Sequence, residues 1–448
     1  MDEFPSGKLE RGKIFAKTGL KVGSNYAKYF VRKAISGEDA ARKQQLNQNN
    51  AQDVFKEFTK LRGTALKLAQ SMSMDTGILP DEFIDVMSNA QYRVPPINRA
   101  LVRAIIKQEL GKYPEMLFSK FGAEAIAAAS IGQVHRAELK DGRAVAVKIQ
   151  YPNVRETIKS DLTIAKALFK RIVRSEMTDA YFEEIYGKLL EETDYLNEGL
   201  QIEQFAQLSL HPQIVTPRLI PEMTTRRVLA MTFLDGVHLD EFLKRRPDDE
   251  TRDHFGQIFW EFFNEQILHR SAVLYADIHP GNFLFRDDGT LGVIDFGCVK
   301  SFPRDFLEKL LLMFDANLRE DIPAIKQLYY ETEILDPANK GTAKEQRTFD
   351  FFYNLGGLIL HPFRAETFDF GDPEYKAALN KFFKEATTMS DVRGSRHYIF
   401  LNKVVVGLYS LLMKLGATVH TTTSRQVLSE AVAEIRKQGS AVSETVSP

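Results

Sequence analysis

Cysteine is almost missing from this sequence, because Cys298 is the only one among 448 residues. A single cysteine excludes a disulfide within the chain and a metal site built on paired cysteines. This cysteine content suits a reducing compartment such as the cytoplasm. The formal net charge is only −1, so there is no overall basic footprint for nucleic acid, and we expect no nucleic-acid partner.

A long uninterrupted apolar run is also missing. The most apolar late stretch runs from Tyr398 to Val419, and Asn402, Lys403 and Lys414 interrupt it. Charges at such depths in hydrocarbon are costly, so this stretch predicts a buried amphipathic helix rather than a transmembrane helix. The first residues are acidic, unlike a secretory or mitochondrial targeting signal. We therefore expect a cytoplasmic protein without a transmembrane helix.

Positive charge is concentrated near the start of the chain. From Lys8 to Lys33, lysines and arginines are opposed only by Glu10, and apolar residues are interleaved with them. A basic amphipathic helix of this kind can lie on an anionic membrane surface. The alternative is a helix that packs on the main body with its basic face in solvent. The sequence leaves both interpretations open.

The secondary-structure signals divide the chain into three parts and a tail. Residues 1–115 have apolar residues at helical spacing and predict a helical extension. Residues 116–234 contain short strands and one long helix, and residues 235–438 are mainly helical. Residues 439–448, rich in Ser, Thr and Val, predict a disordered tail. This α+β order, a small strand-rich lobe before a larger helical lobe, is that of a bilobal protein-kinase-like fold.

Two short motifs in the second half have the spacing that phosphoryl transfer requires. Asp277 stands five residues before Asn282, and Asp295 follows in an Asp-Phe-Gly tripeptide after an apolar run. The reaction needs one carboxylate near the attacking hydroxyl or water, and further oxygens for a magnesium ion. The spacing predicts Asp277 as the catalytic residue and Asn282 and Asp295 as ligands of Mg²⁺. The plain alternative is two unrelated turns with capping Asp residues.

An apolar strand that ends in a single lysine precedes these motifs. Lys148 closes the run Val145-Ala146-Val147-Lys148 and can reach nucleotide phosphates if a helix carboxylate orients it. The long helix, expected from Thr178 to Leu208, places Asp194 and Glu198 on one face. Like charges on one face need cations opposite them, which Lys148 and bound magnesium would supply. A surface lysine and a solvated acidic face are the simpler alternatives.

The segment before this strand lacks the glycine-rich loop of an ordinary kinase. It reads Ala127-Ala128-Ala129-Ser130-Ile131-Gly132. Alanine permits close backbone approach to a phosphate but not the positive φ angles available to glycine. Because an alanine run is also a helix signal, the sequence leaves the conformation of this segment open.

Together these residues resemble the UbiB/AarF family of atypical kinases, and the resemblance covers most of the chain. The alanine-rich segment followed by Ser-Ile-Gly-Gln-Val-His and the Asp-x-His-Pro-Gly-Asn loop are typical of that family. Its other signatures are a Lys-x-Gly-Gln motif, here Lys67-Leu68-Ala69-Gln70, and a Glu-x-Asp motif, here Glu192-Thr193-Asp194. The resemblance implies that Lys148 pairs with Glu198 and that Lys67 reaches toward Glu192 and Asp194.

By this resemblance the chain is an atypical kinase or ATPase that binds Mg²⁺ with ATP or ADP between two lobes. It supports ubiquinone-like isoprenoid-quinone metabolism, with lipids or proteins of that pathway as partners and a peripheral membrane contact. The implied nucleotide site comprises Lys67, Gln70, Ala127, Ala128, Ala129, Ser130, Lys148, Glu192, Asp194 and Met231, with Glu198 as the catalytic partner of Lys148.

Two alternatives to this activity remain. An ordinary Ser/Thr protein kinase is disfavoured, because no long activation loop and no Ala-Pro-Glu motif follow Asp295. A nucleotide-gated binding module without turnover is the second alternative, motivated by the alanine segment and by the cation of Lys67.

The sequence departs from the family pattern in three respects. Ala69 replaces a glycine, and Met231 occupies the hinge where a Glu is common. Tyr275 and Ile278 stand where His and Pro are common around Asp277. None of these changes removes a metal ligand or the phosphate lysine, so they bear on substrate class and rate rather than on nucleotide binding.

Overall fold

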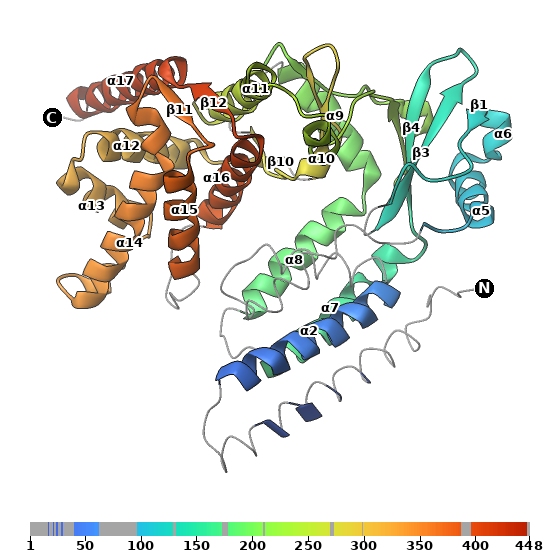
Figure 1. Cartoon of the computed structure of the whole chain (residues 1–448), viewed down its shortest axis with the longest axis horizontal. Coiled ribbons are helices and arrows are strands. Elements are labelled where there is room, and N and C mark those ends of the chain that lie inside the picture. The colour runs from blue at the N-terminus through green and yellow to red at the C-terminus, as the bar shows by residue number, and fades with distance from the viewer. Residues whose placement is uncertain are drawn as a thin grey trace. The chain divides into compact units, whose positions relative to one another are not determined.

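The computed structural model divides the chain into two compact units (Figure 1). The first comprises residues up to Glu203 together with Arg218–Phe233, and the second comprises Gln204–Pro217 together with Leu234 onward. The residues that the structure describes are 17, 21, 24–25, 28–29, 40–61, 96–128, 131–172, 178–208, 211–268, 273–297, 299–386 and 396–445. Each unit has its own sheet structure and its own buried apolar residues.

The first unit is built on a five-stranded antiparallel sheet. Its strands are β1 (Phe118–Phe121), β2 (Ala127–Ala128), β3 (Gly132–Leu139), β4 (Ala144–Gln150) and β6 (Val228–Thr232). The spatial order is β1-β3-β4-β6, and β2 pairs with β3. The hairpin between β3 and β4 turns at Gly142, whose φ of 88° glycine adopts without a steric penalty. Lys148 lies in β4, between Val134 of β3 and Leu229 of β6.

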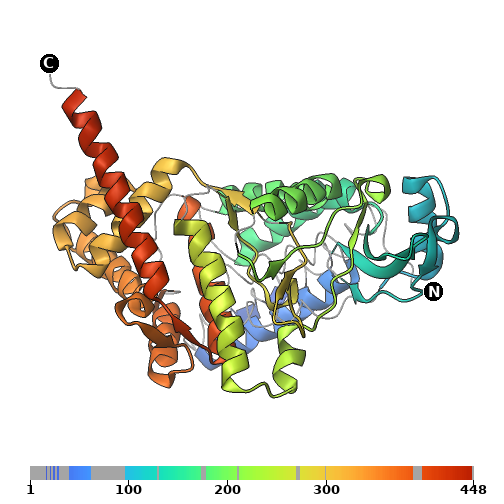
Figure 2. The ribbon, with the colours of Figure 1, turned by 90° about the horizontal axis from the view of Figure 1, so that it is seen from above.

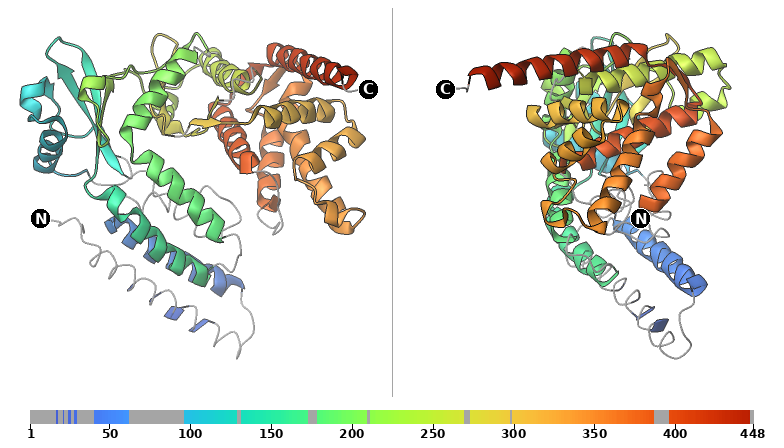
Figure 3. Two further views of the ribbon diagram at one scale, coloured as in Figure 1. Left: turned by 180° about the vertical axis from the view of Figure 1, so that it is seen from behind. Right: turned by 90° about the vertical axis from the view of Figure 1, so that its left-hand side faces the viewer.

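The two faces of this sheet differ because side chains alternate along a strand. On β4, Val147 and Ile149 are fully buried in the apolar core of the unit. The helix α5 (Arg99–Leu110) contributes to the same core, and Figure 3 shows α5 and α6 (Pro114–Leu117) on that side of the sheet. Lys148, which stands between the two core residues in the sequence, therefore projects from the opposite face.

The expected long helix of the first unit is interrupted. The remaining helices that begin in this unit are α2 (Ala40–Leu61), α7 (Val154–Ile172), α8 (Thr178–Glu192), α9 (Tyr195–Leu208) and the short 3₁₀ helix η2 (Pro221–Met223). The prediction of one helix from Thr178 to Leu208 is thus wrong. Gln150 donates from Nε2 to the carbonyl of Thr193 at 3.1 Å, and Arg155 donates to the Thr193 hydroxyl at 3.2 Å. These side chains bond groups at the end of α8, where a helix leaves carbonyls unsatisfied, and so stabilise the break.

The second unit is mainly helical. Its helices are α10 (Leu239–Lys244), α11 (Asp249–Leu268), α12 (Arg304–Leu318), α13 (Ile322–Glu331), α14 (Ala343–Ile359), α15 (Pro373–Ala386), α16 (Arg396–Leu415) and α17 (Thr422–Thr445), with 3₁₀ helices η3 (Pro280–Asn282), η4 (Pro337–Asn339) and η5 (His361–Arg364). Half of the residues of α11 are buried, and Trp260 in its middle donates from its indole N–H to Ser424 of α17 at 3.1 Å. This helix therefore forms the centre of the second unit.

Short strands hold the loops of the second unit. They are β5 (Ile214–Val215), β7 (Val273–Tyr275), β8 (Phe283–Phe285), β9 (Leu291–Val293), β10 (Val299–Ser301), β11 (Thr367–Asp369) and β12 (Thr418–His420). β8 and β9 pair antiparallel, β5 adds to β9 in parallel, and β7 pairs with β10. The loops that follow β7 and β9 carry Asp277, Asn282 and Asp295.

The apolar stretch near residue 400 forms a buried helix, as predicted. In α16, Val404, Leu408 and Leu411 are buried and recur at helical spacing. The helix ends before Gly416, which adopts a φ of 62°, and the chain continues into β12. Among the described residues, no helix is both long enough and apolar enough to cross a membrane.

The C-terminal helix is longer than the sequence predicts. A disordered tail was expected over residues 439–448, whereas α17 continues to Thr445 (Figure 2). Earlier in this helix, Leu428, Val432 and Ile435 are buried at helical spacing. A helix that is already nucleated by packed turns extends at little cost, which accounts for the added residues.

Candidate functional site

Lys148 and Glu198 form a buried ion pair in the first unit. The Lys148 Nζ lies 2.8 Å from Oε1 and 3.0 Å from Oε2 of Glu198. The two side chains are only 12% and 5% exposed. Burial of either charge alone is costly, so each stabilises the charged form of the other in this place. The pair gives Lys148 a defined position on the face of the sheet opposite the apolar core.

The break between α8 and α9 places Glu198 opposite Lys148. Asp194 precedes the first residue of α9, and its carbonyl accepts the backbone N–H of Glu198 at 3.2 Å. Asp194 is therefore the N-cap residue of α9, because its carbonyl accepts the first hydrogen bond of the helix. Glu198 therefore lies in the first turn of α9, where the helix dipole favours a negative charge. The sequence predicted that Asp194 and Glu198 lie on one face of a continuous helix. This prediction is wrong, because α8 ends at Glu192 and α9 begins at Tyr195.

Three other predicted nucleotide residues of the first unit, Glu192, Asp194 and Met231, lie at the end of α8, at the break before α9 and in β6. Glu192 ends α8, and the carboxylate of Asp194 lies 3.7 Å from the guanidinium of Arg226. Met231 is buried in β6, where it pairs with Ala146 of β4. The Lys-x-Gly-Gln motif, with Lys67 and Gln70, lies outside the described residues.

The alanine-rich segment begins as a strand rather than as a helix. Ala127 and Ala128 form β2, where they pair with Val134 and Gln133 of β3. Ala129 and Ser130 lie outside the described residues. The sequence left open whether the alanine run forms a helix. For its first two residues the structure shows a strand, because β3 lies beside them and pairs with them.

A buried polar chain, which the sequence did not reveal, adjoins this segment. Ile97 donates its N–H to Oε1 of Gln133 at 2.7 Å, so the Gln133 amide nitrogen faces Nε2 of His135, 2.7 Å away. His135 must accept there, which places its ring proton on Nδ1, 2.9 Å from the carbonyl of Gly122. Burial lowers the pKa of His135, which favours this neutral ring.

In the second unit, Asp277 and Asn282 are joined by a hydrogen bond. The Asn282 Nδ2 donates to Oδ2 of Asp277 at 2.9 Å and to its backbone carbonyl at 3.0 Å. The residues between them form a tight turn that ends in η3, with His279 accepting the N–H of Gly281. Because the amide nitrogen of Asn282 points to Asp277, its carbonyl oxygen is directed away from that carboxylate.

Asp295 lies beside Asn282. The backbone N–H of Ile294 donates to the carbonyl of Asn282 at 3.1 Å, which brings the two loops together. Oδ1 of Asp295 accepts the N–H of Gly297 at 2.9 Å, and this bond orients the carboxylate. A carboxylate and an amide oxygen are hard ligands of the kind that Mg²⁺ binds, so the donor set fits that ion. The structure therefore brings Asp277, Asn282 and Asp295 together within one unit.

Sequence reasoning treated Tyr275 only as a departure from a family pattern. The side chain is fully buried, and its hydroxyl donates to the backbone carbonyl of Asp295 at 2.8 Å. Its backbone N–H donates to Oε1 of Gln266, on α11, at 2.7 Å. Tyr275 thus links the strand before Asp277 to the backbone of Asp295. A buried tyrosine next to a motif is a signal for such a link, but it does not identify the acceptor.

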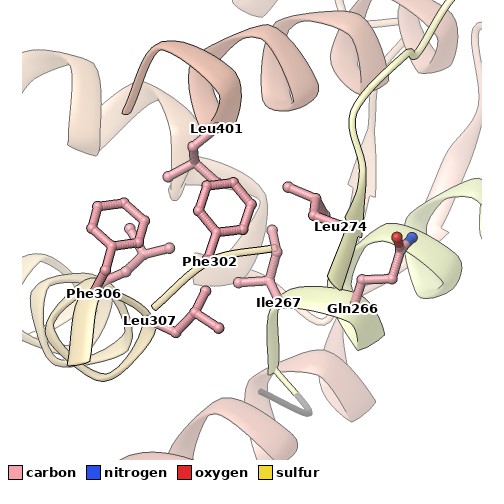
Figure 4. Close-up of a pocket in the computed structure, with 8 residues that line it drawn as sticks. Gln266, Ile267, Leu274, Phe302, Phe306, Leu307 and Leu401 are labelled. Carbon is pink, nitrogen blue, oxygen red and sulfur yellow. The ribbon is translucent and has the colours of Figure 1, made fainter. Parts of the chain in front are cut away.

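An apolar pocket in the second unit does not contain these residues (Figure 4). It is lined by Gln266, Ile267, Leu274, Phe302, Phe306, Leu307, Leu310 and Leu401. The amide of Gln266 is engaged, with Nε2 bonded to the carbonyl of Phe262 at 2.8 Å and Oε1 bonded to Tyr275. The lining carries no charged side chain, so this pocket is unsuited to a nucleotide phosphate.

Comparison with known proteins supplies the family. Residues 89–329 match the ABC1 atypical kinase-like domain. The chain is 28% identical over 440 residues to "Atypical kinase COQ8, mitochondrial" of Saccharomyces cerevisiae, covering 93% of this chain and 83% of that protein. It is 34% identical over 306 residues to "Protein ACTIVITY OF BC1 COMPLEX KINASE 8, chloroplastic" of Arabidopsis thaliana, covering 66% of this chain and 40% of the relative.

Other relatives are longer than this chain. "Probable serine/threonine-protein kinase abkA" of Dictyostelium discoideum is 28% identical over 345 residues, which cover 72% of this chain and 61% of the relative. An uncharacterized protein of Synechocystis matches over only 44% of its own length. The chain therefore spans less than two thirds of each of these two relatives.

A solved structure shares the fold. It is the complex of Rv3197 from Mycobacterium tuberculosis with erythromycin, with a TM-score of 0.60, 24% sequence identity, and coverage of 87% of this chain and 97% of that one. At this identity the likeness supports the α+β kinase-like fold alone. The domain match spans more than half of the sequence. On this evidence the chain belongs to the UbiB/AarF (ABC1) family of atypical kinase-like proteins.

Proposed function

We propose that this protein is a Mg²⁺-dependent ATPase, or a kinase acting on a small molecule or lipid. In this function Lys148 contacts the phosphates of ATP or ADP, and Glu198 holds the lysine in place. Asn282 and Asp295 hold Mg²⁺, and Asp277 orients the attacking hydroxyl or water. The observation that carries the proposal is the buried pair of Lys148 and Glu198, because a charged lysine fixed at this depth is suited to an anionic ligand.

The second unit supports the proposal through its oxygen donors. Asn282 contacts Asp277, and the backbone of Asn282 accepts from the residue before Asp295, so a metal and a carboxylate base have places in the same loops. Magnesium, when bound, neutralises charge on the phosphate oxygens during transfer. The chain's own part is to orient the donors: Gly297 fixes one carboxylate, and Asn282 fixes the other.

The wider role is inferred from the relatives. Family resemblance, together with the yeast and chloroplast kinases named above, supports a role in isoprenoid-quinone metabolism, with lipids or proteins of such a pathway as partners. The basic segment from Lys8 to Lys33, most of which lies outside the described residues, is proposed as a peripheral contact with anionic lipid. The less favoured activity is phosphorylation of proteins on serine or threonine.

The test is Mg²⁺-dependent ATP hydrolysis, measured with and without anionic vesicles. We expect Asp295→Asn to lower turnover by about 100-fold or more, because it weakens a hard oxygen ligand of the metal. Asp372→Asn is the matched control, since Asp372 accepts the N–H of Glu374, two residues on, at 2.9 Å, as Asp295 does with Gly297. This control should hydrolyse ATP like the unchanged protein.

Each outcome separates the candidate functions. Turnover that vesicles increase and Asp295→Asn abolishes supports a membrane-stimulated ATPase. Tight Mg²⁺-dependent nucleotide binding, with turnover equal to that of Asp277→Asn, supports the binding module without turnover. Nucleotide binding that is indifferent to Mg²⁺ contradicts the proposal. Robust phosphorylation of peptides that is lost in Asp295→Asn would favour the protein-kinase alternative.

A further inference from the structure

Tyr195 is a fully buried side chain beside the Lys148–Glu198 pair. It is the first residue of α9 and stands three residues before Glu198, so the two side chains share a face of the helix. Its backbone N–H donates to the carbonyl of Arg226 at 3.2 Å, which attaches the start of α9 to the chain before β6. The position of this tyrosine is therefore set by backbone contacts as well as by packing.

The aromatic ring of Tyr195 faces the lysine. The Lys148 Nζ lies 5.2 Å from the ring centroid, within the range of a cation–π interaction. This interaction stabilises the ammonium through the π face and uses no oxygen lone pair. It therefore supports the charge of Lys148 without adding an acceptor that competes with phosphate oxygens for the N–H donors of the lysine.

The hydroxyl of Tyr195 lies against the start of β3. A Cβ atom at Gly132 would stand 2.7 Å from this oxygen and 2.6 Å from the carbonyl oxygen of Ile149. Only glycine fits there without displacement of its neighbours. Gly132 pairs with Gln150, and it follows the alanine-rich segment at Ala127–Ser130. One side chain thus touches the lysine, the helix of its carboxylate partner and the strand that leaves the alanine-rich segment.

We infer that Tyr195 is a positioning residue for nucleotide phosphate: its ring sets the position of the Lys148 ammonium. This inference rests on the proposed function, since it concerns the same lysine. It identifies a determinant of phosphate binding that is neither a charged group nor part of a named motif.

The experiment measures ATP affinity in four proteins: the unchanged chain, Tyr195→Leu, Lys148→Met and the double variant. The lost cation–π contact should weaken ATP binding by about 5- to 30-fold in Tyr195→Leu. In the Lys148→Met background the same change should have no further effect, because Tyr195 acts through the lysine. A purely structural role would instead lower the affinity equally in both backgrounds, and that result would overturn the inference.

Two further variants guard against loss of folding. Tyr195→Phe keeps the ring and should bind ATP within about 3-fold of the unchanged chain. The protein with 3,4,5-trifluorophenylalanine at position 195 keeps the shape of the ring but has a weaker π face, so it should bind ATP less tightly than the Tyr195→Phe protein. Equal affinity of these two proteins contradicts the inference. Tyr151→Leu, at a fully buried tyrosine in the apolar core of the same unit, is the control for lost packing and should keep its ATP affinity.

The proposed function and this inference fail differently. If the unchanged chain does not bind ATP, or if Lys148→Met binds it equally well, the proposed function is wrong. If Lys148→Met weakens binding but Tyr195→Leu does not, the function stands and only the role of Tyr195 is wrong.

Discussion

The hydroxyl of Tyr275 donates a hydrogen bond of 2.8 Å to the backbone carbonyl of Asp295. Tyr275 lies two residues before Asp277, so this bond ties the strand that leads to one acidic residue to the backbone of the other. Phe296 and Phe205 pack against the same tyrosine ring, with centroids 6.0 Å and 5.9 Å away. The bond therefore lies in a rigid aromatic environment, in which its loss cannot be replaced by water without rearrangement.

Tyr275→Phe should weaken the effect of Mg²⁺ while the fold is kept. The variant removes only one oxygen and leaves the Asp295 carbonyl without this donor. The loss should lower the free energy of unfolding by about 1–3 kcal/mol. We expect the Mg²⁺ concentration for half-maximal ATP hydrolysis to rise by several-fold. Tyr375→Phe is the control, because the Tyr375 hydroxyl donates to the Leu358 carbonyl at 2.9 Å in the same unit. If both variants shift the Mg²⁺ dependence equally, Tyr275 has no specific role.

Glu198→Gln should destabilise the first unit. It leaves the charge of Lys148 in a place where only 12% of the side chain is exposed, and breaking a buried pair in this way costs about 3–5 kcal/mol. Urea unfolding measures the change. Glu138→Gln, which breaks a pair with Lys120 in a position where the side chains are 35% and 79% exposed, should change the stability by less than about 1 kcal/mol. Similar losses in the two variants would contradict the buried position of the first pair.

Gly407→Ala should disturb the loop that carries Asp277. A Cβ atom on Gly407 of α16 would lie 2.8 Å from Cβ of Ile278 and 3.0 Å from its carbonyl oxygen. Relief of this overlap requires the helix or the loop to move, with a loss of stability of about 1–3 kcal/mol.

The same variant should reduce ATP turnover more than ATP affinity, because Ile278 directly follows Asp277, the proposed catalytic residue. The matched variant Gly357→Ala, in α14, meets no atom within 4 Å and should be neutral or slightly stabilising. Turnover that survives unchanged in Gly407→Ala would show that the loop tolerates the displacement.

Acid should destabilise the first unit through His135. Burial lowers the pKa of this ring below its ordinary value of about 6.5, so the unfolded chain binds the proton more readily than the folded chain. The contribution of neutral His135 to the free energy of unfolding is complete above about pH 6.5 and is lost as the pH falls through the lowered pKa. Protonation would also place a donor on Nε2 against the amide of Gln133.

Unfolding by urea between about pH 7.5 and 5 checks this effect. The free energy of unfolding should fall with pH in the unchanged chain and fall less steeply in His135→Gln, which cannot titrate. Parallel pH profiles of the two proteins would mean that other groups determine the acid sensitivity.

Local patterns in the sequence were enough to predict much of this molecule. The kinase-like α+β fold could be predicted from the order of strand and helix signals along the chain, and the domain match confirms it. Lys148 was placed on a strand, and Asp277, Asn282 and Asp295 were predicted to lie close together. Their roles stay predictions. Such residues are predictable because their chemistry depends on short spacing within one loop or one strand.

Other features depend on residues far apart in the chain. The end of α8 is held by Gln150, 43 residues before Thr193, so helical periodicity alone predicted one continuous helix. Ala127 and Ala128 form a strand because β3 lies beside them. No local rule selects Tyr195 as the ring beside Lys148, since the two are joined only by packing.

The sequence by itself determined which charged groups this protein has and the strands, helices and loops on which most of them lie, because periodicity and motif spacing are local properties. Only the tertiary structure decided which partner each group meets. The pairing of Lys148 with Glu198 and the bond from Tyr275 to Asp295 depend on long-range packing, which alone determines which side chains become neighbours and which are removed from water.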